Sequence, residues 1–319
     1  MEAKKSENNM NVNNPKISIG IPVYNGEKFI RKCIESVLQQ TNKNFELIIS
    51  DNASTDSTQE ICQNFSKKDD RIQIFKQEKN IGIHRNFYFL LSQAKGKYFA
   101  WAAVDDYLDK DFMEKNLKVL ESRNSTVSSI GKIIPYGTES LKIDSKLIDT
   151  SNYPKFLKNY VKHGRHKKMM DTGPVSGDIN TKIRNLLKIT KSLGRWYGVH
   201  RTEQLKQCIV KKPFINVEVA VFLNLLRLGD FYEESSTTLY EFDEGVSSRG
   251  IINMAKNSEH NAFEIIFPFY PFTKWLIQNF GMLAFIRNFD ILLKMNWGGG
   301  FALIIDLFLK IINGHKKTR

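Results

Sequence analysis

The chain has 319 residues, of which 41% are hydrophobic and 25% charged, and these proportions exclude wholesale disorder. Its length suits one large domain, or one domain with an appended module. The formal net charge is +13, and residues 151–212 alone carry 15 Lys or Arg against three acids. This basic block favours a polyanionic partner, such as a phosphate-bearing substrate, anionic lipid or nucleic acid, although a solvated basic surface explains it equally well.

The N-terminal residues 1–14 are polar and contain no apolar signal core, so we expect a disordered leader there. No run of about 18 uncharged apolar residues occurs, which argues against a simple transmembrane helix. The three cysteines lack metal-ligand spacing, and Cys33 and Cys62 fall on apolar faces of expected helices. Buried, reduced thiols are the simplest interpretation, and they indicate a reducing, cytoplasmic compartment.

Apolar strand patterns and amphipathic helix patterns alternate through the first third of the chain. We expect strands over 16–24, 45–50, 71–75 and 97–104, and helices over 27–40, from 57 onward and over 86–94. Asn25 is expected to cap the first helix, and Ser57 with Glu60 has the spacing of a capping box. The short links predict an α/β fold with a mostly parallel sheet and flanking helices.

Polar side chains follow three of the expected strands. Asn25 comes after the first strand, Asp51 and Asp56 after the second, and Asp105 and Asp106 after the fourth. Each alone is an ordinary turn. Because the carboxyl ends of parallel strands meet at one edge, where such folds bind ligands, the three groups together predict one site.

Four segments have the order, spacing and strand context of a known family: Pro22–Gly26, Ser50–Thr58, Asn80–Gly82 and Asp105–Asp106. Across roughly residues 16–121 the chain resembles the nucleotide-sugar half of the family 2 glycosyltransferases. The resemblance implies a GT-A type, Rossmann-like sheet. It also implies transfer of a sugar from a nucleotide-diphosphate donor, most commonly a UDP-sugar, to an acceptor hydroxyl with inversion.

The resemblance also assigns residues to the donor site. Asp51 would contact the nucleobase, and Asp105 and Asp106 would hold Mn²⁺ or Mg²⁺ against the diphosphate. The remaining residues expected at the donor site are Pro22, Tyr24, Asn25, Asp56, Asn80 and Gly82. One departure is Ala103, which stands where the family often has a first Asp. Metal binding survives this loss, because Mg²⁺ needs only one or two protein carboxylates. The sugar or ribose contact of that first acid is left in doubt.

Residues 122–250 are expected to form the acceptor half of the domain, after a donor half at 15–121. Trp196–Leu205 resembles a strand-to-helix segment of the same family, and Glu218 lies at the family's catalytic acid position, ahead of Gly229. We therefore expect Glu218 to act as the general base. A helix N-terminal acid stabilised by the dipole is the structural alternative.

Three further segments have weaker assignments. Alternating residues over 129–148 suggest strands, and residues 231–242 one or two more. The basic cluster 162–168 is either a solvated surface or a contact to a phosphate or membrane, and Ser247–Arg249 is a weak candidate for the diphosphate.

From residue 251 to the C-terminus the composition shifts. An aromatic-rich segment at 263–275 precedes amphipathic helix patterns at 281–294 and 301–312. Two interpretations stay open for this extension. It packs on the catalytic domain or a second subunit, giving a homo-oligomer, or it makes a peripheral contact with an anionic membrane.

These observations favour a metal-assisted glycosyltransferase that acts on a saccharide, a lipid-linked acceptor or a protein, in the assembly of surface polysaccharide, glycolipid or protein glycans. An inactive nucleotide-sugar-binding module is the alternative, and Ala103 is its one support. A nucleotidyltransferase is disfavoured because no Gly-rich basic loop follows the first strand. We expect no nucleic-acid partner, since no recognition motif accompanies the basic block.

Overall fold

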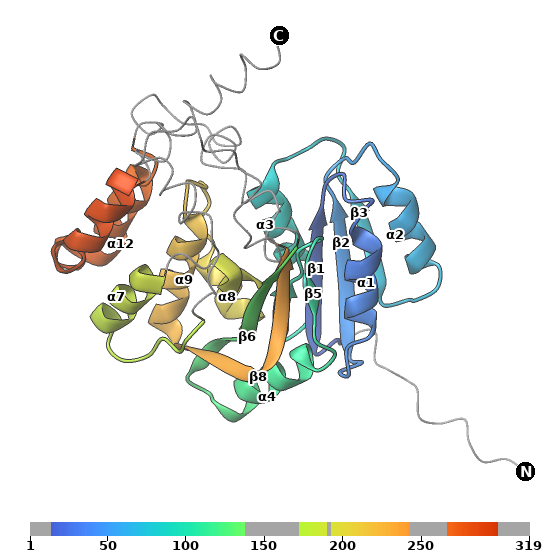
Figure 1. Cartoon of the computed structure of the whole chain (residues 1–319), viewed down its shortest axis with the longest axis horizontal. Coiled ribbons are helices and arrows are strands. Elements are labelled where there is room, and N and C mark those ends of the chain that lie inside the picture. Colours follow the sequence, from blue (N-terminus) through green and yellow to red (C-terminus); the bar gives the residue numbers. More distant parts are fainter. Residues whose placement is uncertain (1–13, 138–171, 190–192, 243–266, 299–319) are drawn as a thin grey trace, which may run out of the picture.

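The computed structural model describes residues 14–137, 172–189, 193–242 and 267–298 (Figure 1). Several predicted segments lie outside these residues. They are most of the leader, the later part of the 129–148 pattern, the basic cluster 162–168, the Ser247–Arg249 loop and the helix pattern at 301–312.

The first half of the sheet is parallel, as predicted. It contains β1 (Ile17–Val23), β2 (Phe45–Asp51), β3 (Ile72–Lys76) and β4 (Tyr98–Trp101). β1 lies between β2 and β4, and β3 pairs with the outer side of β2. β1 and β2 are almost completely buried, because helices cover both faces of the sheet. The carboxyl ends of β1, β2 and β4 therefore point the same way.

The helices of this half divide between the two faces. They are α1 (Ile30–Leu38), α2 (Thr58–Ser66), α3 (Ile83–Gln93) and α4 (Phe112–Ser122). Residues of α1, α2 and α4 share one apolar core with the odd-numbered residues of β1, whereas α3 belongs to the core on the opposite face. Figure 1 shows α1 and α2 together at one end of the molecule.

The starts of two helices differ from their predictions, and a third helix, α2, starts as expected but lacks the predicted capping bond. α1 begins at Ile30, and Asn25 does not cap it; Asn25 has a left-handed φ of 51°. Ser57 precedes α2 without a side-chain capping bond. α3 begins at Ile83, three residues earlier than expected, directly after Gly82 with φ 84°. The side chains of Asn25 and Asn80 hydrogen-bond to other loops, so local capping patterns misplace the starts of α1 and α3.

The second half of the sheet is mixed. It contains β5 (Tyr107–Leu108), β6 (Thr126–Tyr136), β7 (Val199–Arg201) and β8 (Asp230–Phe242), and the full order is β3-β2-β1-β4-β7-β6-β8-β5. β7 is antiparallel to both β4 and β6, and β8 runs parallel to β6. The segment predicted as one or two strands is thus one long strand, with two register shifts in its pairing to β6.

The remaining helices cover the face of the sheet that carries α3. They are α7 (Ile179–Ile189), the 3-10 turn η1 (Leu193–Tyr197), α8 (Thr202–Cys208), α9 (Val217–Leu228) and α12 (Tyr270–Arg287). Trp101 and Trp196 stack at 4.2 Å in this core, next to Phe222. Cys33, Cys62 and Cys208 are free and buried, as expected of structural thiols.

The C-terminal helices differ from the prediction, which had a helix beginning at residue 281. α12 contains Gly281 at φ 83°, which interrupts the helix instead of beginning it. A second helix, Phe289–Gly298, follows at an angle of 104°. Among the described residues no single helix has the length and apolar character to cross a membrane, and only this bent pair meets both criteria together.

Candidate active site

Hydrogen bonds join the loops after β1 and β2 at the sheet edge. The Asn25 side-chain oxygen accepts from the Thr55 N–H at 2.8 Å, and the Asn25 N–H donates to Ser54 Oγ at 2.8 Å. The Gly26 N–H donates to Thr58 Oγ1 at 2.8 Å. A β-carbon at Gly26 would lie 2.6 Å from Val23 Cγ2, so this close turn requires glycine. Asn25 therefore holds the two loops together.

Asp51 is completely buried at the end of β2. Its Oδ1 accepts from the Ser54 N–H at 2.9 Å. Its Oδ2 is also buried and meets no hydrogen-bond donor in the described part of the chain. Burying a carboxylate oxygen without a hydrogen-bond donor costs free energy. Such an oxygen is therefore uncommon in a folded protein unless a ligand supplies the donor.

Asp56 has a positioning role in the structure. Its Oδ1 accepts from the Thr58 N–H and hydroxyl, and its Oδ2 accepts from the Glu27 N–H at 3.1 Å. Burial acts to raise the pKa of Asp56, but the hydrogen bonds from Thr58 and Glu27 outweigh it and hold the pKa below its usual value. Its predicted contact with the donor stays a prediction.

Asn80 and Gly82 form the entry to α3. Asn80 Oδ1 accepts from Asn52 Nδ2 at 3.0 Å and from the Gly82 N–H at 2.9 Å. Asn52 Oδ1 in turn accepts from the Ile81 N–H at 2.9 Å. This network ties the β3–α3 loop to the end of β2, beside Asp51. Gly82 adopts a φ that other residues avoid, which accounts for a glycine at this position.

Pro22 and Tyr24 lie at the end of β1. Pro22 is half-buried in register with Ser50 of β2, and Tyr24 is exposed immediately after the strand. An exposed tyrosine at the mouth of a site offers an aromatic face for stacking.

Asp105 and Asp106 follow β4. Asp106 is 7% exposed, and its Oδ1 accepts from the Phe242 N–H at 2.9 Å, at the end of β8. The Asp105 carbonyl accepts from the Tyr136 hydroxyl. Burial raises the pKa of Tyr136, and the charges of Asp106 and Asp105 raise it further. The paired acids are thus held between the ends of β4, β6 and β8.

Ala103 has a structural function through its backbone. Its carbonyl accepts from the Asp106 N–H at 3.2 Å and from the Cys33 thiol at 3.2 Å. These bonds form the turn that carries Asp105 and Asp106, and they use no side chain at position 103. The alanine therefore leaves the turn that presents the two acids intact.

Glu218 lies in the first turn of α9, where the helix dipole favours a carboxylate. Its Oε1 is 3.7 Å from Nδ1 of His84 at the start of α3, and both side chains are partly exposed. Burial raises the pKa of Tyr88, one turn further along α3, and the Glu218 charge raises it further. Glu218 therefore faces the loop network around Asn80 and Gly82.

Tyr197 is buried and feels the charge of both groups of acids. Burial raises its pKa well above the usual value, and the charges of Asp106, Asp105, Glu241 and Glu218 each add to the rise. Because charge effects fall with distance, Glu218 and the Asp105–Asp106 pair all lie close enough to act on this one tyrosine.

Sequence reasoning missed three residues here: His84, Tyr197 and Glu241. Tyr197 lies in the segment Trp196–Leu205, which resembles the family, but the sequence assigned no role to this tyrosine. His84 and Glu241 carried no local signal, because only the folded chain brings α3, α9 and β8 together.

A divalent metal fits the paired acids by the chemistry of the donors. Hard cations prefer carboxylate oxygens, and Mg²⁺ takes one or two of them with water and phosphate oxygens in the other positions. Asp105 and Asp106 supply two carboxylates at the expected edge. Within the described residues no cluster of three or more His, Cys, Asp or Glu forms a metal cage. The arrangement therefore suits a metal bound jointly with a phosphate ligand.

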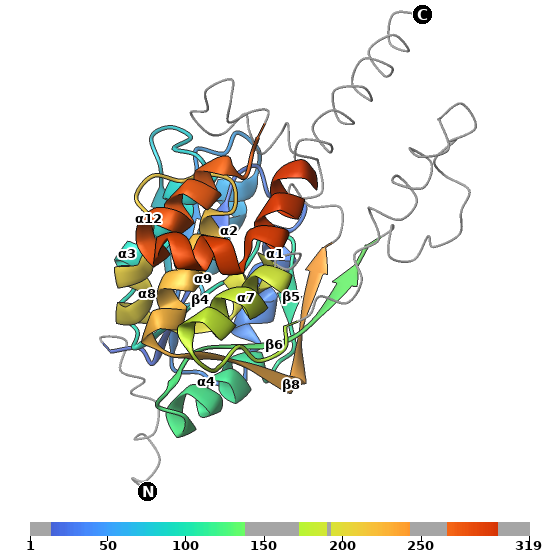
Figure 2. The same ribbon diagram turned by 90° about the vertical axis from the view of Figure 1, so that its left-hand side faces the viewer.

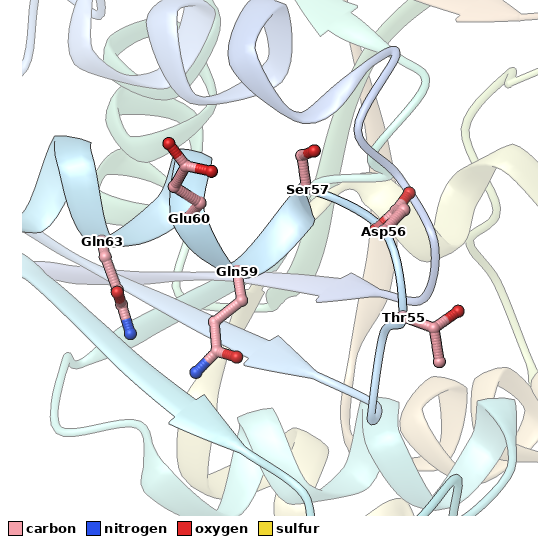
Figure 3. Close-up of a pocket in the computed structure, with 6 residues that line it drawn as sticks. All are labelled: Thr55, Asp56, Ser57, Gln59, Glu60 and Gln63. Carbon is pink, nitrogen blue, oxygen red and sulfur yellow. The ribbon is translucent and has the colours of Figure 1, made fainter.

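A separate hollow runs along the start of α2 (Figure 3). Its lining residues are polar: Thr55, Asp56, Ser57, Gln59, Glu60 and Gln63. Figure 3 shows these side chains along the outside of the β2–α2 loop and the first turns of α2. The hollow carries two acids and no basic residue, so it is a poor site for a diphosphate.

Comparisons with known proteins define the class. Residues 18–176, about half of the chain, match the model of glycosyl transferase family 2. "Glycosyltransferase GlyA" of Streptococcus pneumoniae is 31% identical over 144 residues, covering 45% of this chain and 20% of GlyA. The chain belongs to glycosyltransferase family 2, a family of transferase enzymes, although it spans only a fifth of that relative.

Solved structures show the same fold. TarS (residues 1–349) of S. aureus in complex with UDP-GlcNAc has a TM-score of 0.53 at 15% identity, covering 88% of this chain and 81% of TarS. The mannosyltransferase PcManGT from Pyrobaculum calidifontis, in complex with GDP-Man and Mn²⁺, has a TM-score of 0.56 at 13% identity, covering 94% and 76%. The GT-A type fold predicted from the sequence is confirmed.

Proposed function

We propose that the protein transfers a sugar from a nucleotide-diphosphate donor, a UDP-sugar, to an acceptor hydroxyl with inversion at the anomeric carbon. The observation that carries the proposal is the convergence of three acidic groups. Asp51 and the Asp105–Asp106 pair lie at one edge of the sheet, and Glu218 faces the same loops from α9. The nucleotide-sugar ligands of TarS and PcManGT support this class of donor.

The nucleobase would bind at Asp51. The N3–H of uracil is a donor that matches the unpartnered Oδ2, and Asn52 and Asn80 supply further polar atoms beside it. Because Oδ2 is covered, the base must displace the side chains over it. Exposed Tyr24 lies at the same edge, where it would stack on the nucleotide.

Asp105 would hold Mn²⁺ or Mg²⁺, and Asp106, already fixed by the Phe242 N–H, would support it. The metal, when bound, supplies positive charge that stabilises the leaving diphosphate. The turn formed by the Ala103 carbonyl keeps both acids at the edge of the sheet.

Glu218 would act as the general base. It accepts the proton of the acceptor hydroxyl as that oxygen attacks the anomeric carbon. The bond to the diphosphate oxygen breaks on the opposite face, and this single displacement inverts the configuration. A positioned base of this kind typically contributes about 10²- to 10⁴-fold in rate. His84 Nδ1 lies 3.7 Å from the carboxylate, near enough to interact with it.

The acceptor would be a saccharide, a lipid-linked intermediate or a protein, in the assembly of surface polysaccharide, glycolipid or protein glycans. The rival proposal is an inactive nucleotide-sugar-binding module, for which Ala103 is the one specific observation. Glu218 and the Asp105–Asp106 pair both act on Tyr197, and this favours the enzyme, because a binding module needs no base near the diphosphate.

The test offers the purified protein UDP-, GDP- and dTDP-sugars with Mn²⁺ or Mg²⁺ and measures nucleotide release with candidate acceptors. We expect release from a UDP-sugar and its loss in Glu218→Gln. Binding of UDP by calorimetry without release from any donor would favour the inactive module. Neither binding nor release would refute both proposals.

A further inference from the structure

The C-terminal helix pair, α12 with Phe289–Gly298, carries a stripe of exposed apolar side chains. Met282, Ile286, Phe289, Leu293 and Trp297 follow one another at intervals of three or four residues. Each is at least 43% exposed, and Trp297 is 74% exposed. Met282 and Ile286 are four residues apart on the first helix, and Phe289, Leu293 and Trp297 are each four apart on the second, so each helix exposes an apolar face. Soluble surfaces scatter single apolar residues but seldom expose two such faces on adjoining helices. The exposed apolar stripe therefore indicates a surface that binds a partner.

The opposite side of the helix pair is anchored to the domain. Phe272, Leu276, Ala284 and Leu292 are buried in the core shared with α7 and α9. Arg227 of α9 lies 3.8 Å over the Phe280 ring, and Arg184 of α7 forms two hydrogen bonds to Asp290 at 2.9 and 3.0 Å. Figure 1 shows α12 at the end of the molecule away from α1 and α2, and Figure 2, which looks onto that end, shows the pair over α7 and α9. The apolar stripe is thus presented outward from a fixed base.

The charges of the helix pair identify the partner. Lys274, Arg287 and Lys294 are exposed, and the one acid, Asp290, is already paired with Arg184. A two-fold contact with a second copy would place the same cationic surface on both sides of the interface, which opposes association. A bilayer with anionic headgroups accepts both the apolar stripe and the cations.

We propose that the C-terminal helix pair binds the surface of an anionic phospholipid bilayer, with the stripe from Met282 to Trp297 entering the headgroup region. Lys274, Arg287 and Lys294 then contact lipid phosphates, and Trp297 takes the interfacial position typical of tryptophan. The pair lies in the interface because the 104° bend turns its second helix away from the first. The inference uses none of the residues assigned to sugar transfer.

The test is flotation of the full chain with vesicles of phosphatidylcholine alone or mixed with phosphatidylglycerol. We expect binding to the mixed vesicles only. Ile286→Ser with Trp297→Ser should lower the partition coefficient on the order of a hundred-fold, because two large apolar side chains no longer leave water. Arg287→Gln with Lys294→Gln should lower it about thirty-fold, since each cation contributes about fivefold near an anionic surface.

Matched controls separate the stripe from general surface properties. Ile134→Ser removes an exposed apolar side chain from β6, and Lys67→Gln with Lys68→Gln removes two exposed cations after α2. Neither should change binding. Tryptophan emission should shift to the blue with mixed vesicles in the wild type and not in Trp297→Phe.

Equal binding by the stripe variant and the wild type would overturn the proposal. Absence of vesicle binding would also overturn it. So would a dimer in light scattering that becomes a monomer in the stripe variant, because the stripe would then be a subunit interface. Thermal unfolding of each variant checks that the fold is retained, and UDP binding should remain unchanged in all of them.

Discussion

Asp51→Asn separates two effects of the buried Asp51 carboxylate: its cost to the stability of the fold and its contribution to nucleotide binding. The substitution keeps an oxygen that accepts from the Ser54 N–H and replaces the unpartnered Oδ2 with an uncharged NH₂ group. An uncharged group costs less to bury than a carboxylate oxygen without a donor. The variant should therefore be as stable as the wild type, or more stable by up to about 2 kcal/mol.

Nucleotide binding should change in the opposite direction. A hydrogen bond to a charged group contributes about 1.5–3 kcal/mol, which corresponds to a loss of UDP affinity of about 10- to 150-fold. The new NH₂ group would face the N3–H of uracil as a second donor, so the loss should lie toward the upper end of this range. Stability is measured by denaturant unfolding and affinity by calorimetry with Mn²⁺ present.

Asp69→Asn is the matched control. Asp69 is bound by Arg71 through hydrogen bonds of 2.9 and 2.6 Å, and the Arg71 hydrogen bonds hold its pKa below the usual value. This variant should lose stability and keep its UDP affinity. The reasoning is refuted if Asp51→Asn binds UDP like the wild type, or if it loses as much stability as the control.

Three further predictions address the base, the metal and a buried histidine. Glu218→Gln should lower kcat about 10²- to 10⁴-fold while UDP affinity by calorimetry stays within twofold or so, since a base acts only on the acceptor; an unchanged kcat would remove it from this role. Chelation with EDTA should abolish transfer, and Mn²⁺ should restore it in the wild type and only weakly in Asp105→Asn, as measured by nucleotide release; full activity in EDTA would contradict a metal site. Burial lowers the pKa of His200 to about 4. As the pH falls, His200 therefore takes up its proton in the unfolded chain before it does so in the folded one. The contribution of neutral His200 to the free energy of unfolding is fully present above about pH 6.5 and should fall by roughly 3 kcal/mol as the pH drops to 4. Urea unfolding across that range should show the decline in the wild type and a flatter profile in His200→Gln.

The strands and the sheet edge could be predicted because their signals are local. Buried parallel strands appear as continuous apolar runs, and the acids that end them, Asp51 and Asp105, stand at the place where the next loop must begin. The family pattern often has a first Asp at position 103, and its absence left the sugar or ribose contact in doubt. The structure gives position 103 a backbone role, which explains why the turn tolerates alanine.

The remainder of the site depends on contacts between distant segments. Asn25 and Asp56 looked like parts of local caps and turns, yet their side chains bond across two loops. The approach of His84 to Glu218 requires α3 and α9 to pack side by side, which no spacing in either segment reveals. Gly281 carried the signal of a helix boundary, and the structure places a kink there.

The central claim is that a nucleotide diphosphate binds across Asp51 and the Asp105–Asp106 pair. A crystal structure of the protein with UDP and Mn²⁺ tests it most directly. The account predicts uracil within hydrogen-bond distance of Asp51 Oδ2, and the metal on Asp105 with the diphosphate beside it. Nucleotide bound elsewhere, for example in the polar hollow along α2, with Asp51 Oδ2 still covered, would contradict the account.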